Sequence, residues 1–214
     1  ASLGGITIGK EGASTTHFSI VDAAGNAVSL TYTLNDWFGA RVTADGTGIL
    51  LNDEMDDFSS KPGFPNMYGL VEGTNNAIAP YKRPLSSMSP TIVLKDGQLF
   101  MVVGTPGGSH IPTGVLQVMI NAIDYRMTLT EAVDAPRIHA QWMPDVIFHE
   151  ADALSADTRA ALIAKGHKLE QMDYWNQVAV IMVGAPALGR EPRGTMRLYG
   201  AIDPRLPVGT VDGY

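Results

Sequence analysis

A hydroxyl nucleophile is the chemistry that this sequence supports best. Cysteine is absent from the 214 residues, which excludes thiol nucleophiles, disulfides and thiolate zinc sites. The five histidines are scattered without the spacing of metal ligands, and no G-x-S-x-G elbow, phosphate loop or dinucleotide fingerprint occurs. We therefore interpret the histidines as structural, expect no metal and no cofactor, and look for a hydroxyl with another source of base.

Thr15 opens a segment rich in β-formers, directly after a glycine-rich stretch. An internal threonine hydroxyl is a poor nucleophile. A threonine at a chain terminus carries an α-amine with a pKa of roughly 7.7–8.0, which accepts the hydroxyl proton near neutral pH. This chemistry requires prior cleavage of the bond between Ser14 and Thr15. The alternative is that Thr15 and Thr16 are ordinary strand residues, because threonine is common in strands.

Gly107 and Gly108 lie between the end of an expected strand and the start of an expected helix. Paired glycines allow backbone N–H groups to approach a ligand closely, and a helix N-terminus adds a favourable partial charge. An oxyanion hole for acyl transfer is built in this way. A plain turn is the alternative interpretation.

Two further segments carry polar groups of opposite character. Residues 50–58 place four carboxylates in five positions, which suits an ammonium group or a divalent cation. Residues 85–90 offer several hydroxyls beside apolar neighbours, which suits a carboxylate. The alternatives are a solvated acidic loop for the first segment and a loop entering a strand for the second.

The elements that must position these groups follow a layered pattern. A β-hairpin is predicted over residues 15–21 and 27–34, and a second over 91–94 and 99–103. Residues 35–90 have weak periodicity, and a loop region of this length is usually functional. Helices are predicted near 112–124, at 128–135 with a Thr128–Glu131 capping box, and at 155–165 as an amphipathic helix between Ser155 and Gly166; late strands are predicted at 178–183 and 197–202. Strands, then helices, then strands indicate an α+β fold.

The composition fits one domain or one folded half of a larger protein. Fifteen Lys and Arg against 22 Asp and Glu give a net charge of −7, and this acidic balance argues against a nucleic-acid partner. Hydrophobic residues make up 45% and charged residues 17%, so a real core is expected. No apolar run is long enough to span a membrane, and residues 1–14 lack the pattern of a signal peptide.

Four segments, in family order and at family spacing, resemble the small subunit of γ-glutamyltranspeptidases: TTHFSIVDAAGNAVSLTYTLN, GILLNDEMDDFSSKPG, KRPLSSMSPTIV and GTPGGSHI. The resemblance runs from Thr15 to Tyr214. It implies an N-terminal-nucleophile hydrolase with an αββα sandwich, in which this chain supplies part of both sheets. Residues 15–214 are then the catalytic domain. Residues 1–14 are an upstream segment, either the tail of the large subunit or an uncut precursor linker.

The resemblance also implies a role for individual residues. Thr15 is the self-cleavage nucleophile and, once freed, the catalytic nucleophile, while Thr33 hydrogen-bonds and orients it. The remaining roles are substrate contact for Asn35, α-ammonium binding for Glu54 and Asp57, α-carboxylate binding for Ser86 and Ser87, shielding by Tyr68 in a lid loop over residues 62–73, and the oxyanion hole for Gly107 and Gly108. Family members carry either Gln or Glu at the position of Glu54.

The implied activity is γ-glutamyl transfer and hydrolysis through a γ-glutamyl-threonine ester, with amino acids or peptides as acceptors. The implied partner is a large subunit from the same precursor, in an obligate heterodimer, so the isolated chain is expected to expose a large apolar face. The family suggests a bacterial protein that is periplasmic or secreted.

Two other functions remain open: a cephalosporin or glutaryl-amide acylase of the same family, and a non-catalytic γ-glutamyl-binding relative. Glu54 and Asp57 together favour a substrate with an α-ammonium. Retention of Thr15, Thr33 and the glycine pair disfavours a mere binder. Trp37 and Phe38 are interpreted equally well as lining the acceptor side or as core packing, and Trp175 is open in the same way.

Overall fold

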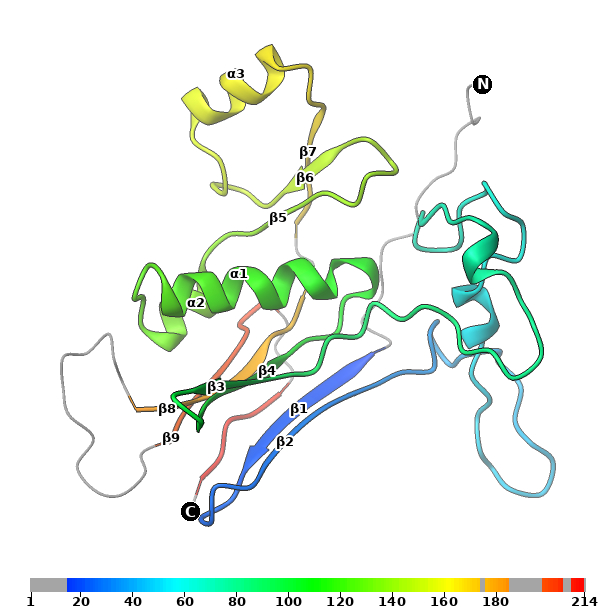
Figure 1. Cartoon of the computed structure of the whole chain (residues 1–214), viewed down its shortest axis with the longest axis horizontal. Coiled ribbons are helices and arrows are strands. Elements are labelled where there is room, and N and C mark those ends of the chain that lie inside the picture. The colour runs from blue at the N-terminus through cyan, green and yellow to red at the C-terminus, as the bar shows by residue number, and fades with distance from the viewer. Residues whose placement is uncertain (1–14, 174–175, 185–197, 206–208, 214) are drawn as a thin grey trace.

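The computed structural model describes residues 15–173, 176–184, 198–205 and 209–213 (Figure 1). Its elements, in chain order, are β1 (Thr16–Val21), β2 (Ala27–Tyr32), the 3-10 helices η1 (Glu54–Asp57) and η2 (Thr74–Asn76), β3 (Thr91–Lys95), β4 (Gln98–Gly104), the 3-10 helix η3 (Gly108–His110), α1 (Ile111–Ile123), α2 (Leu129–Asp134), β5 (Ile138–His139), β6 (Ile147–His149), α3 (Ala156–Ala164), β7 (Leu169–Gln171), β8 (Ala179–Val183) and β9 (Leu198–Ile202). None of the helices among these described residues is long and apolar enough to cross a membrane.

The β1–β2 hairpin forms as predicted. Its turn is closed by the Asp22 carboxylate, whose Oδ1 accepts hydrogen bonds from the backbone N–H groups of Ala24 (2.9 Å) and Asn26 (2.8 Å). The ladder ends with Thr16 opposite Tyr32, two residues before the predicted end of the second strand. The residues just outside this last pair therefore lie at the open end of the hairpin, beside the loop region of residues 35–90 (Figure 1).

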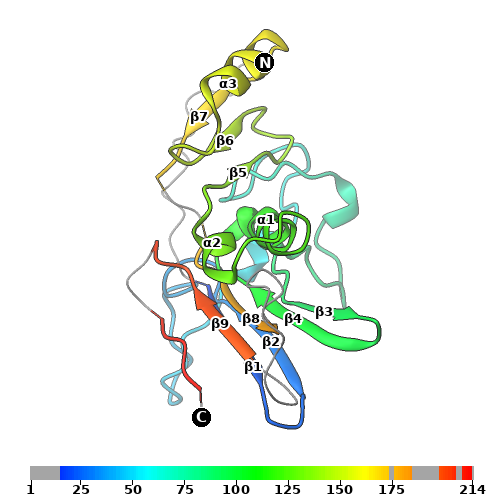
Figure 2. The same cartoon turned by 90° about the vertical axis from the view of Figure 1, so that its left-hand side faces the viewer.

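The main sheet is antiparallel, with strand order β3-β4-β8-β9. Helices α1 and α2 cover one of its faces, and the β1–β2 hairpin lies against the other face, along β4 and β8 (Figure 2). The core lies between the helices and the sheet and includes Met101, Val103, Val118, Val133 and Val180. Helices, sheet and hairpin form three successive layers, which fits the expected sandwich.

The hairpin presents its polar side chains to the sheet. The His17 ring is hydrogen-bonded through Nδ1 to the Thr31 hydroxyl (2.8 Å) and through Nε2 to the Ser19 hydroxyl (3.1 Å). The hydroxyls of Ser19 and Ser29 each donate to a backbone carbonyl of the facing sheet, on β8 and β4, at 3.1 Å. Burial lowers the pKa of His17 to about 4, so the ring is neutral. A polar seam therefore joins the two β layers.

The outer face of the same hairpin is apolar and exposed. Alternation along a strand sends successive side chains to opposite faces, so a polar inner face leaves the apolar residues outside. These residues are Phe18, Ile20, Val28, Leu30 and Tyr32, all of them exposed. The expected exposed apolar face is confirmed and lies on β1 and β2.

The segment after α2 differs most from the prediction. It forms a small sheet, β5-β6-β7, whose strands have only two or three residues and are too short to show a period-2 pattern in the sequence. The expected capping box of α2 is present, with Thr128 and Glu131 bonded reciprocally.

Helix α3 begins after Ser155 as predicted, and the Ser155 hydroxyl accepts the Thr158 N–H at 3.1 Å. The prediction that this helix is amphipathic is wrong, because none of its residues is buried and Ile163 is 59% exposed. Its larger apolar residues, Leu162 and Ile163, are adjacent in sequence and diverge on the helix surface instead of forming a stripe at three- and four-residue spacing.

Candidate active site

Thr15 and Thr33 meet at the open end of the hairpin. The Thr15 hydroxyl donates to Thr33 Oγ1 at 3.0 Å, and Thr15 is only 9% exposed. The Thr33 oxygen also accepts the backbone N–H of Asn35 at 2.8 Å, which fixes its position. Because Thr16 pairs with Tyr32, the hairpin register itself brings these two threonines together. The pair predicted from the sequence thus forms a direct hydroxyl-to-hydroxyl contact.

Asn35 and Tyr68 enclose the threonine pair from the loop region. Asn35 is 3% exposed and adopts a left-handed backbone conformation (φ 76°), which asparagine tolerates better than most residues. The Tyr68 hydroxyl donates to the Asn35 backbone carbonyl at 3.0 Å. The lid-loop tyrosine is therefore placed at the site, 33 residues along the chain from its partner.

A small pocket, open to solvent, lies at the threonine pair. Most of the residues singled out in the sequence contribute to its walls. The lining consists of Thr15, Thr33, Asn35, Asp57, Tyr68, Ser86, Ser87, Met88, Gly108 and Ile111. Of the predicted set, Glu54 and Gly107 are not part of the lining. Glu54 shares a hydrogen bond with Asp57, and Gly107 precedes Gly108 in the chain.

The glycine pair forms the turn between β4 and the first helical residues. Gly107 has φ 137° and Gly108 has φ 53°, conformations that favour glycine. The His110 N–H donates to the Gly107 carbonyl at 3.0 Å, which starts the 3-10 helix η3 that leads directly into α1. The N–H groups of Gly107 and Gly108 come before this first hydrogen bond of the helix, a position at which backbone N–H groups suit a developing negative charge.

Glu54 and Asp57 form a hydrogen-bonded carboxyl pair on η1. Their three-residue spacing places them on one side of the 3-10 helix, and their carboxyl groups share a hydrogen bond. Burial, followed by the hydrogen bond with Glu54 and the negative charges of Glu54, Asp56 and Glu72, raises the pKa of Asp57 to about 7. Burial also raises the pKa of Glu54. Two carboxyls held this close favour a bound cation or a shared proton.

The other two acids of this cluster, Asp53 and Asp56, accept hydrogen bonds from backbone N–H groups. Asp53 Oδ1 accepts the N–H of Asp36 at 2.9 Å, and Asp56 Oδ2 accepts the N–H of Met67 at 3.0 Å. Among the described residues, no group of three or more histidine and acidic side chains is arranged to hold a metal ion. Of the four acids, Asp57 alone lines the pocket, with Glu54 hydrogen-bonded to it, and the divalent-cation interpretation of the acidic segment gains no support.

A sequence profile of the family described as Gamma-glutamyltranspeptidase matches residues 5–210. The chain belongs to the γ-glutamyltranspeptidase family. The glutathione hydrolase proenzyme of Pseudomonas sp. (strain A14) is 63% identical over 204 residues, which are 95% of this chain and 36% of that protein. The chain thus spans about a third of the length of this curated relative. The T380A mutant of Helicobacter pylori γ-glutamyltranspeptidase superposes with a TM-score of 0.82 at 50% identity, covering 89% of this chain and 100% of that chain.

These matches confirm the N-terminal-nucleophile hydrolase fold predicted from the sequence. An acylase proenzyme (ACY 1) of Pseudomonas sp. (strain V22) is also related, at 37% identity over 188 residues, which are 88% of this chain and 30% of that protein. The similarity to the glutathione hydrolase is therefore well above the similarity to this acylase.

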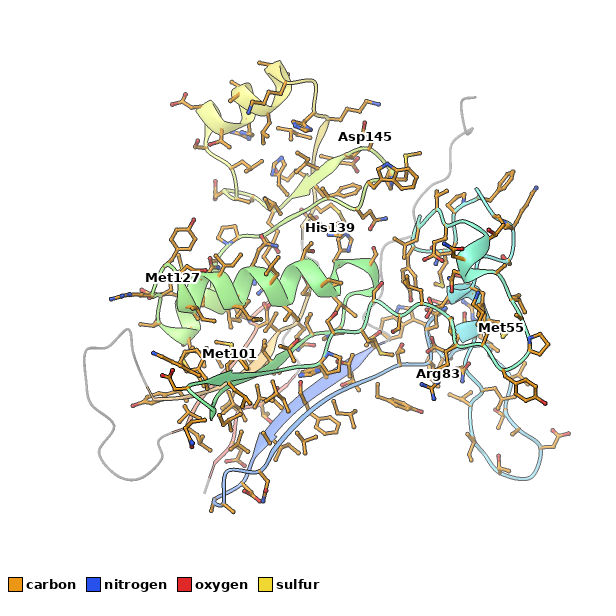
Figure 3. All side chains as sticks on the ribbon, in the orientation of Figure 1. Met55, Arg83, Met101, Met127, His139 and Asp145 are labelled. Carbon is orange, nitrogen blue, oxygen red and sulfur yellow. The ribbon has the colours of Figure 1, made fainter. Side chains whose placement is uncertain are left out.

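One part of the γ-glutamyltranspeptidase site was missed by the sequence analysis. Gln141 Nε2 donates to the Tyr68 carbonyl at 3.1 Å, and its Oε1 contacts His139 Nε2 at 2.8 Å. His139 lies over the start of α1 and contacts the Thr113 hydroxyl through Nδ1 at 2.8 Å (Figure 3). Burial lowers the pKa of His139 to about 4, so the ring is neutral. This chain of contacts ties the lid loop to α1, and its members are too far apart in sequence to form a motif.

Trp37 and Phe38 are 50% and 65% exposed, and neither lines the pocket. Their interpretation as core residues is therefore wrong, because the loop after Asn35 turns outward here, with Phe38 itself at φ 60°. Trp175 lies outside the described residues.

Proposed function

We propose that this chain is the small subunit of an enzyme that transfers and hydrolyses γ-glutamyl groups of glutathione and other γ-glutamyl amides. The observation that carries the proposal is the Thr15–Thr33 hydroxyl contact at a pocket. The same pocket is lined by Asp57, Ser86, Ser87 and Gly108. The 63% identity to a protein named glutathione hydrolase proenzyme supports the same activity.

The reaction proceeds by acyl transfer to Thr15. Scission of the bond after Ser14 frees the Thr15 α-amine, which accepts the hydroxyl proton as the oxygen attacks the γ-carbonyl. The backbone N–H groups of Gly107 and Gly108 stabilise the resulting oxyanion. The carbon–nitrogen bond then breaks, the amine leaves with that proton, and a γ-glutamyl ester remains on Thr15. Water or an acceptor amine then attacks the ester carbonyl and gives a proton to the Thr15 α-amine. The bond between the acyl carbon and the Thr15 oxygen breaks, glutamate or the new γ-glutamyl amide leaves, and the proton passes to the Thr15 oxygen.

The pocket is suited to a zwitterionic amino-acid head. Glu54 and Asp57 receive the α-ammonium, and the hydroxyls of Ser86 and Ser87 receive the α-carboxylate. Each charge-assisted hydrogen bond of this kind contributes about 1.5–3 kcal/mol. Asn35 contacts the donor and Tyr68 shields it from solvent. Two clamps of opposite character hold the γ-carbonyl between Thr15 and the glycine turn.

The proposed partner is a large subunit made in the same precursor. Residues 1–14 are the tail of that subunit or a linker of the uncut precursor, and cleavage after Ser14 separates them from residues 15–214. The exposed apolar face of the β1–β2 hairpin is its natural contact surface, because an apolar sheet face of this kind requires a covering layer. The relative's printed name, a proenzyme, is consistent with this origin. The bacterial relatives suggest a periplasmic or secreted enzyme.

A γ-glutamyl-p-nitroanilide assay on the processed, assembled enzyme, with and without glycylglycine, tests the proposal. We expect release of p-nitroaniline that accelerates with glycylglycine, and a γ-glutamyl adduct on the peptide that begins with Thr15. Preference for a glutaryl amide would instead indicate an acylase. A fully processed sample, verified by intact mass, that binds but never turns over the donor would indicate a non-catalytic binder.

A further inference from the structure

We propose that Thr105 and Asn176 are positioning residues for the oxyanion hole. Both donate hydrogen bonds to the Pro106 carbonyl and thereby orient the N–H donors of the glycine turn. The inference rests on the proposed function, because it assigns a purpose to groups behind the same site. Neither side chain is part of the pocket lining, and each acts through the backbone of the glycine turn.

Two buried donors converge on one backbone oxygen. The Thr105 hydroxyl donates to the Pro106 carbonyl at 2.7 Å, and Asn176 Nδ2 donates to the same oxygen at 3.1 Å. Thr105 is 0% exposed and Asn176 is 1% exposed. A buried carbonyl needs one hydrogen bond to be satisfied. A second one, from a residue 70 positions away, fixes the direction of the carbonyl as well.

The direction of this carbonyl determines the direction of the next N–H. The peptide between Pro106 and Gly107 is trans, since the only cis bond in the described part of the chain is Met143–Pro144. In a planar trans peptide the carbonyl and the N–H point in opposite directions. With the Pro106 oxygen held by these two donors, the Gly107 N–H points away from them. In the proposed orientation it points toward the pocket that the neighbouring Gly108 lines.

The surroundings of Asn176 fit a positional role. A side chain on Gly114, in the first turns of α1, would overlap the Asn176 carboxamide, so this glycine makes room for it. Asn176 Oδ1 is buried and has no hydrogen-bond partner among the described residues, which costs stability. The amide orientation is nevertheless fixed, because a flipped Oδ1 would face the Pro106 oxygen and repel it.

The kinetic signature follows from the role of an oxyanion hole, which contacts charge that develops only in the transition state. Deleting an oxyanion donor outright lowers kcat by about 10²–10³-fold. Loosening the peptide that carries the donor should lower kcat by about tenfold and leave the donor KM within about twofold, because the α-ammonium and α-carboxylate clamps are untouched.

The test compares Thr105→Val, which keeps the shape and removes the hydroxyl, with Thr105→Ser, which keeps the hydroxyl. We expect the first to lower kcat as above and the second to restore it. Asn176→Asp is the isosteric second probe, since a carboxylate has no proton to donate and repels the Pro106 oxygen. Ser19→Ala, which removes a hydroxyl-to-carbonyl bond in the polar seam, is the matched control and should keep the kcat of the parent enzyme.

All rates are divided by the amount of free Thr15 N-terminus measured by intact mass, so that impaired self-cleavage is not mistaken for impaired turnover. A γ-boronic acid analogue of glutamate, which places an anionic oxygen in the hole when Thr15 adds to it, should lose affinity in Thr105→Val in proportion to kcat/KM. Glutamate itself should bind unchanged.

A matured Thr105→Val enzyme with the parent's kcat and boronate affinity would overturn the proposal, as would a loss confined to KM. If Thr105→Val does not mature, Asn176→Asp and Asn176→Ser are read by the same criteria. Absence of γ-glutamyl turnover in the parent enzyme would refute the proposed function instead, so the two failures are distinguishable.

Discussion

The Glu54–Asp57 carboxyl pair makes the pH dependence of donor binding predictable. With a pKa of about 7, the Asp57 carboxyl is protonated in an increasing fraction of empty sites as the pH falls below neutrality. The donor's α-ammonium requires the ionised form, so the shared proton must leave before the ammonium binds. The donor KM should therefore rise by about tenfold for each pH unit below about 7, and should level off above it.

Two substitutions separate the contribution of charge from that of the pKa. Asp57→Asn cannot ionise, so its donor KM should no longer depend on pH near neutrality. The lost charge-assisted hydrogen bond, about 1.5–3 kcal/mol, corresponds to an increase in KM of about 10–150-fold at alkaline pH. Glu54→Gln removes a partner that raises the pKa of Asp57, so its KM profile should shift to lower pH.

The assay measures donor KM with γ-glutamyl-p-nitroanilide across a pH series for the processed, assembled enzyme and both variants. A glutaryl-p-nitroanilide donor, which lacks the α-ammonium, is the control and should show no such titration. The reasoning would be refuted by an Asp57→Asn enzyme with the parent's KM at alkaline pH. A parent KM that stays flat through neutrality would refute the assigned pKa.

Three further predictions concern the nucleophile, the hairpin and acid stability. Thr33→Val removes the acceptor of the Thr15 hydroxyl and should lower kcat by about tenfold in single-turnover acylation, whereas Thr33→Ser should retain the rate. Leu30→Asp, on the apolar hairpin face, should abolish co-purification of the large subunit, whereas a substitution on exposed α3 should not. His17 and His139 have pKa values of about 4 in the fold against 6.5 in the unfolded chain, so the unfolded chain binds more protons between these values. Unfolding free energy measured in urea should therefore fall as the pH drops from about 6.5 to about 4, and the double His→Gln variant should show a smaller fall.

The parts of the fold that local sequence determines were predictable. The Asp22–Asn26 turn, the glycine pair after a strand and the Thr128 cap each depend on contacts within a few residues, and all three formed where expected. The short strands β5, β6 and β7 depend on pairing between distant segments and have too few residues for a periodic pattern. The local sequence therefore did not predict them.

The candidate site, like the fold, has parts that the sequence predicts and parts that it does not. Residue types alone left the nucleophile, the acidic segment and the glycine pair open, and the family resemblance of four segments indicated which side chains meet. Most of that set lines the pocket. The residues that support these side chains could not be predicted from the sequence. Examples are Gln141, which donates to the Tyr68 carbonyl, and Asn176, which donates to the Pro106 carbonyl. They act through backbone atoms of residues 70 or more positions away, and a contact with a backbone carbonyl places almost no demand on the identity of the residue that carries it.

The β1–β2 hairpin, polar toward the sheet and apolar toward solvent, links the proposed assembly to the proposed catalysis. Its inner face holds the main sheet through a few polar contacts, including those of Ser19 and Ser29, while its apolar surface faces outward. Such polar contacts contribute only about 0.5–1.5 kcal/mol each, and most of the hairpin's available hydrophobic stabilisation is unused until a partner covers the outer face. Thr15 and Thr33 lie at the end of this hairpin, so the proposed covering layer would also restrain the proposed nucleophile. Binding of the large subunit should therefore sharpen the position of the Thr15 hydroxyl without contacting it.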